Sequence, residues 1–143
     1  MGIFDKLFPT KKSYPNLDQS SPYARYLEGM QEPLEKLVGE TSDPIELIPS
    51  EKQAFAFIGK PPNRFGVSWV AENGEVVNFK KLVEEKGLPA HKLEKLSAQL
   101  REIYVSHKSE PRYAAKIHDR EIVVTPSGQL LTEVKEVIDK TVG

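Results

Sequence analysis

The chain of 143 residues contains no cysteine, and this excludes disulfide bonds, thiolate metal sites, iron–sulfur ligation and thiol catalysis. Its longest unbroken apolar run, 54–58, is far shorter than the ~20 residues of a transmembrane helix. Charge is nearly balanced, since 20 Lys and Arg face 21 Asp and Glu, so no global field attracts nucleic acid or an acidic membrane. We expect a cytoplasmic protein of one main domain with no transmembrane segment.

Residue types that carry catalysis or bind metals do not form a recognisable site in the sequence. The three histidines, His91, His107 and His118, lack the i, i+4 spacing of a helical zinc pair. Ser127 lacks the flanking pattern of a nucleophile elbow. We therefore expect no catalytic residue, no metal site and no cofactor, and we interpret the protein as non-enzymatic.

The pair Asn73-Gly74 gives the clearest structural signal. It separates two β-rich runs, 66–71 and 75–79, and both of its residues tolerate positive φ. This pattern predicts a type I′ hairpin, and a further strand at 53–58 completes a three-stranded meander.

Apolar residues at helical spacing predict a first helix over 22–38, with Ser21 as its N-cap. Pro33 has no N–H to donate to the carbonyl of Gly29, so we expect a kink or break there. The other expected elements are a helical turn at 43–46, helices at 80–86 and 90–107, strands at 112–117 and 121–125, and a final helix from about residue 130.

These elements predict an α+β fold, with a largely antiparallel sheet of about five short strands and helices packed on its apolar side. Residues 20–143 form the domain, and residues 1–19 form an N-terminal arm and linker. The element order is similar to that of roadblock- and longin-like sandwiches, which assemble through helix or edge-strand pairing. This likeness implies a subunit of a larger assembly.

The arm carries four apolar side chains on one side of a helical turn too short to be stable alone. They are Ile3, Phe4, Leu7 and Phe8. We expect them to bind a protein partner, with docking on the chain's own domain, disorder and weak peripheral membrane contact as the alternatives.

The loop 59–66 is the best candidate for a ligand-binding loop, because it is basic, stiffened by two prolines and carries an aromatic residue. Its candidate residues are Lys60, Asn63, Arg64 and Phe65. Its glycines lack Walker spacing, and an ordinary connection between strands is the alternative.

A resemblance to helix-turn-helix proteins rests on a short helix, a glycine at the turn and a second helix with apolar residues inward. The residues are Leu82, Val83, Gly87, Leu88, Leu93 and Leu96. The following hairpin, 112–125, stands where winged-helix proteins have their wing. The chain departs from the pattern at Val83, where the family has alanine, at Lys86, where it has an apolar residue, and at Pro89 after the turn.

The resemblance implies that His91, Lys92 and Lys95 face the major groove of DNA. It places Lys116, His118 and Arg120 at the wing. Our leading interpretation is a protein-interaction or scaffold subunit that docks through its arm, a sheet edge, or both. The alternative is a nucleic-acid-binding regulator that uses the helix-turn-helix at 80–107 and the wing at 112–125.

Overall fold

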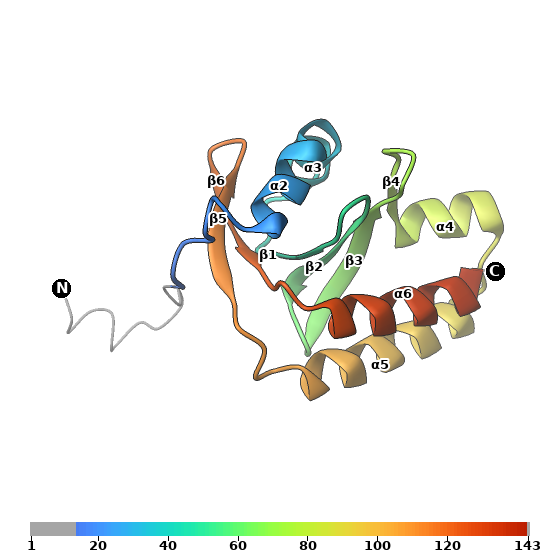
Figure 1. Cartoon of the computed structure of the whole chain (residues 1–143). Coiled ribbons are helices and arrows are strands. Elements are labelled where there is room, and N and C mark those ends of the chain that lie inside the picture. The colour runs from blue at the N-terminus through green and yellow to red at the C-terminus, as the bar shows by residue number, and fades with distance from the viewer. Residues whose placement is uncertain (1–13, 143) are drawn as a thin grey trace.

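The structure is a computed structural model that describes residues 14–142. Its elements, labelled as in Figure 1, are α2 (Pro22–Gly29), α3 (Gln31–Gly39), β1 (Ile45–Pro49), β2 (Ala54–Lys60), β3 (Arg64–Val70), β4 (Val76–Asn78), α4 (Phe79–Lys86), α5 (Ala90–Ser106), β5 (Tyr113–Ile117), β6 (Arg120–Val124) and α6 (Gly128–Val142). None of these helices is long and apolar enough to cross a bilayer.

The strands form one sheet of six, in the order β4-β3-β2-β1-β6-β5. All neighbours are antiparallel except β1 and β6, which run parallel. The α+β class and the mostly antiparallel sheet are confirmed, with one strand beyond the expected number.

Helices cover both faces of the sheet, whereas the sequence predicted them on one side (Figure 1). The helices α2 and α3 bury Leu34 and Leu37 on one face. On the other face, α5 and α6 bury Leu96 and Leu130 together with Trp69 of β3. The sheet is therefore the middle of three layers, and it has two separate apolar cores.

The strand β1 replaces the helical turn that was expected at 43–46. All five of its residues are buried, with Leu47 facing the α2–α3 core and Ile48 facing the α5–α6 core. The capping-box spacing was misleading because pairing with β2 and β6 outweighs a single turn of helix, which is unstable on its own.

The first predicted helix is two helices, and the break lies at Met30 rather than at Pro33. Pro33 is the third residue of α3, where a helical N–H has no intrahelical partner. The missing N–H of proline therefore costs nothing at this position.

The turn at Asn73-Gly74 is not the predicted type I′ turn. Only Gly74 has a positive φ, of 86°, and its N–H donates to the carbonyl of Ala71 at 2.9 Å. The loop thus has three residues and ends in a left-handed glycine. The two-residue turn with positive φ at both positions occurs instead at His118 and Asp119, with φ of 53° and 63°.

Two glycines with positive φ, Gly59 in β2 and Gly74 in the β3–β4 loop, provide a matched test of backbone strain. Gly59 has a φ of 111°, and a Cβ there would lie 2.8 Å from the carbonyl oxygen of Arg64, whereas Gly74 has open space around it. Gly74→Ala should lower the free energy of unfolding by about 1–2 kcal/mol through backbone strain alone. Gly59→Ala should cost more because it adds a clash, and equal urea midpoints for the two variants would contradict the geometry.

Candidate functional site

The chain lies against the outer edge of β5 before it enters α2. The N–H of Ala114 donates to the carbonyl of Pro15 at 2.8 Å, and the N–H of Leu17 donates to the carbonyl of Ala114 at 2.8 Å. Asn16 and Ala114 thereby form a parallel bridge, and Leu17 is buried in the α2–α3 core. The end of the predicted arm is therefore part of the folded domain.

The next outward-facing position on this edge is Lys116. Backbone groups alternate along a strand, so Lys116 turns its N–H and C=O to the same side as Ala114. No backbone partner for them lies within residues 14–142. Among the described residues, the edge of β5 is therefore covered at Ala114 and open at Lys116.

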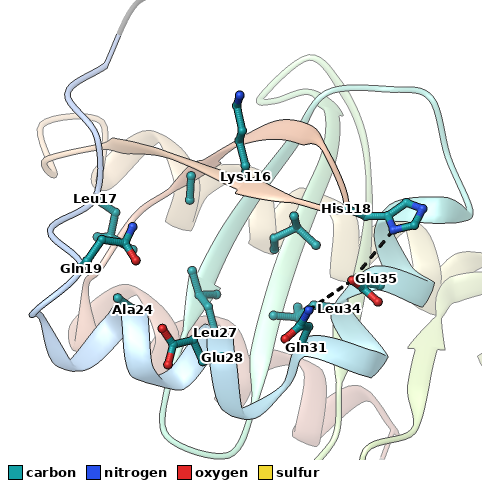
Figure 2. Close-up of a pocket in the computed structure, with 12 residues that line it drawn as sticks. Leu17, Gln19, Ala24, Leu27, Glu28, Gln31, Leu34, Glu35, Lys116 and His118 are labelled. Atoms are coloured by element: carbon teal, nitrogen blue, oxygen red, sulfur yellow. Dashed lines mark hydrogen bonds and ion pairs between the residues drawn. The ribbon is translucent and has the colours of Figure 1, made fainter.

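Beside this open position the surface is hollowed between α2–α3 and β5 (Figure 2). We call this the β5 hollow. Its volume is about 230 Å³, below the ~300–1,000 Å³ of typical small-molecule sites. Its apolar lining consists of Leu17, Ala24, Leu27, Leu34, Ala115 and Ile117. The size and lining suit an apolar side chain better than a whole cofactor.

The helix wall of the hollow is acidic, and the β5 side carries basic residue types. Glu28 and Glu35 come from the helices, and Lys116 and His118 come from the β5 side. In Figure 2 the Lys116 side chain points away from the helices, while His118 turns toward Glu35. The Nδ1 of His118 lies 3.9 Å from Oε2 of Glu35. The carboxylates of Glu28 and Glu35 can therefore pair with a basic group bound in the hollow.

Arg120, predicted to lie on a wing, has a structural role. Its guanidinium donates to the carbonyls of Val38 at 3.1 Å and Thr41 at 2.5 Å, and also to that of Asp43. These carbonyls follow or end α3, whose last C=O groups have no helical partner. Arg120 thus holds the end of α3 against β6 and is not free for a phosphate.

The six predicted nucleic-acid contacts are not brought together. His91, Lys92 and Lys95 are exposed on α5, which packs on one face of the sheet. Lys116 and His118 border the β5 hollow, which α2 and α3 line on the opposite face. The helix pair α4–α5 exists, but the expected wing forms the last two strands, β6 and β5, at one end of the six-stranded sheet.

The loop 59–66 is a tight connection between β2 and β3. Asn63 donates its N–H to the carbonyl of Lys60 at 3.1 Å, and the Phe65 ring packs on Phe57 at 5.5 Å. Lys60, Asn63 and Arg64 are exposed. This loop does not border the β5 hollow, so ligand binding there stays a prediction. The arm residues Ile3, Phe4, Leu7 and Phe8 lie outside the described residues.

A buried polar cluster around Glu46 was not found from the sequence. The carboxylate accepts hydrogen bonds from Tyr104 at 2.9 Å, Thr125 at 2.7 Å and the Nε of Arg112 at 3.2 Å. Glu46 and Thr125 are buried, and the guanidinium of Arg112 also lies 5.5 Å from the centre of the Tyr104 ring. A lone acidic residue within the apolar run 45–49 was the available signal.

This cluster joins elements and does not open onto the hollow. Within residues 14–142, no buried side-chain nitrogen or oxygen lacks a hydrogen-bond partner. A second, partly buried contact of 2.7 Å between Nε2 of His107 and Glu133 ties the end of α5 to α6. Across the described chain, no three His, Asp or Glu side chains converge as metal ligands.

Comparison with known proteins does not extend this description: no protein-family model, no curated protein and no solved structure matches the chain.

The β5–β6 hairpin carries one basic residue with a structural role, Arg120, and one at the surface, Lys116, and substitutions can separate the two roles. Arg120→Met should lower the free energy of unfolding by about 1–3 kcal/mol, because three carbonyls lose a charged donor. Lys116→Met, at an exposed position, should change it by less than about 0.5 kcal/mol. Urea unfolding measures both, and a neutral Arg120→Met would contradict the anchoring role.

The pKa of the Tyr104 hydroxyl is raised to about 12, mainly because the group is buried and also because the Glu46 carboxylate lies beside it. A pKa raised in the folded state gives stability that is complete below the unfolded value of about 10 and is lost as the pH rises toward 12. Tyr104→Phe should therefore flatten the decline in unfolding free energy above pH 10. Tyr23→Phe, outside the cluster, is the control, and identical pH profiles for all three proteins would rule out the linkage.

Proposed function

We propose that this protein is a non-enzymatic interaction subunit that binds an extended segment of a partner protein along β5 and in the β5 hollow. The observation that carries this proposal is the open backbone position at Lys116 directly beside an apolar-lined hollow. The absence of cysteine fits a role in the cytoplasm.

An extended segment matches both features. Its backbone can add to the sheet edge at Lys116, continuing what residues 15–17 already do at Ala114. A side chain from the same segment can then enter the hollow, where Leu27 and Ile117 offer apolar contact. The carboxylates of Glu28 and Glu35 on the rim supply specificity, since an acidic partner segment would place like charges together.

Nucleic-acid binding remains the alternative prediction. It would rest on His91, Lys92 and Lys95 of α5, without the help of Arg120, whose guanidinium is engaged. Binding to duplex DNA that weakens steeply with salt would favour this alternative, because phosphate contacts release counterions. No such binding is expected from the protein-interaction proposal.

A substitution that fills the hollow tests the proposal. Gln31 is exposed and borders the hollow, so Gln31→Trp should place a ring over it without disturbing a core. Glu85→Trp, exposed on α4, is the matched control. We expect the tagged full chain and Glu85→Trp to capture the same partner from the native source, and Gln31→Trp to lose it.

Two controls make this experiment decisive. The thermal midpoints of the variants should match, so that loss of capture reports on the surface alone. Nuclease treatment separates a protein partner from one bound through nucleic acid. Equal capture by all three proteins would contradict the assignment of the site to the hollow.

A further inference from the structure

The start of the described chain, where residues 1–13 are attached, lies near the β5 hollow. Asn16 is level with Ala114, so residue 14 lies beside the start of β5, and Lys116 is two residues further along the strand than Ala114. The described chain therefore begins, at residue 14, within roughly 13 Å of Lys116 beside the hollow, since a strand rises ~3.3 Å per residue.

This distance is short compared with the reach of the segment. Residues 9–13 span up to roughly 17 Å when extended. Apolar residues before Pro9 can thus turn back to the hollow while residues 15–17 stay paired with β5. The segment is long enough, and no rearrangement of the described residues is needed.

The chemistry of the segment complements the hollow. Ile3, Phe4, Leu7 and Phe8 supply apolar side chains for its apolar lining. The segment carries three lysines, Lys6, Lys11 and Lys12, against one aspartate, Asp5, for a charge of +2. The helix wall of the hollow presents Glu28 and Glu35, so the charges of segment and wall are opposite.

We propose that residues 1–13 of the same chain occupy the β5 hollow, so that a partner must displace them to bind. This inference rests on the proposed function, because it takes the hollow as a site for polypeptide. A tethered segment competes at an effective concentration in the millimolar range, for a short flexible linker. The segment therefore sets the threshold affinity that a partner needs.

The lack of cysteine makes a direct test straightforward. Gly2→Cys gives the full chain a single thiol for a spin label. In the isotopically enriched protein, the amide signals of Gln31, Lys116 and His118 should lose most of their intensity. Signals of α4, at the opposite edge of the sheet beyond β4, should keep theirs.

A charge-reversal pair provides the matched control. Glu28→Lys with Glu35→Lys should restore the lost intensity, because the helix wall then repels the lysines of the segment. Glu84→Lys with Glu85→Lys makes the same charge change on exposed α4 positions and should leave the loss in place. Recovery in both double variants would overturn the assignment to this wall.

The remaining outcomes separate the alternatives. Intensity loss in a mixture of spin-labelled unenriched chain and enriched unlabelled chain would overturn the proposal in favour of exchange between two copies. No loss in any sample would overturn docking altogether. If docking is absent while Gln31→Trp still abolishes partner capture, this inference fails and the proposed function stands. If docking is seen while Gln31→Trp keeps its partner, the proposed function fails instead.

Discussion

The fold depends on a carboxylate buried in the middle of the sheet. Glu46 lies on β1, which is buried on both faces, so its charge is stable there only with close partners. Those partners are Tyr104 at the end of α5, Arg112 before β5 and Thr125 after β6. The Glu46 side chain thus holds the β5–β6 hairpin against strands β1–β4, at the point where β1 and β6 run parallel. Removing one partner of such a pair costs about 3–5 kcal/mol, although a well-packed apolar replacement of the whole cluster can be neutral.

The candidate site follows from this constraint. Arg112 anchors the β5–β6 hairpin at its open end, and Arg120 anchors it near its turn by binding the carbonyls after α3. With both ends held, β5 lies at a fixed distance from α2 and α3, and the β5 hollow is the space left between them (Figure 2). Because both ends of the hairpin are held, little free energy would be lost in ordering the walls of the hollow around a bound segment.

The sequence predicted elements well where local signals agree with tertiary packing. Asn78 caps α4 by accepting the N–H of Lys81 at 2.8 Å, and Gly87 ends that helix in the left-handed conformation. The sequence failed where a long-range contact decides the outcome. β1 is a strand only because β2 and β6 flank it. In the sequence Arg120 resembles a phosphate-binding residue, and only the fold shows that its guanidinium binds a carbonyl of α3. The hollow itself joins residues about a hundred positions apart, such as Leu17 and His118, which no local pattern reports.

Some basic residues of the chain stabilise the fold, and others are exposed at the surface. The stretch 80–120 has ten Lys and Arg against six Asp and Glu, an excess that suggests a binding face. Arg112 and Arg120 belong to this excess, yet both are partly buried and engaged with protein oxygens. Arginine suits this use because its planar fork serves several acceptors at once. Lysines such as Lys116 remain at the surface, where a charge beside an open strand edge deters unspecific pairing with other strands.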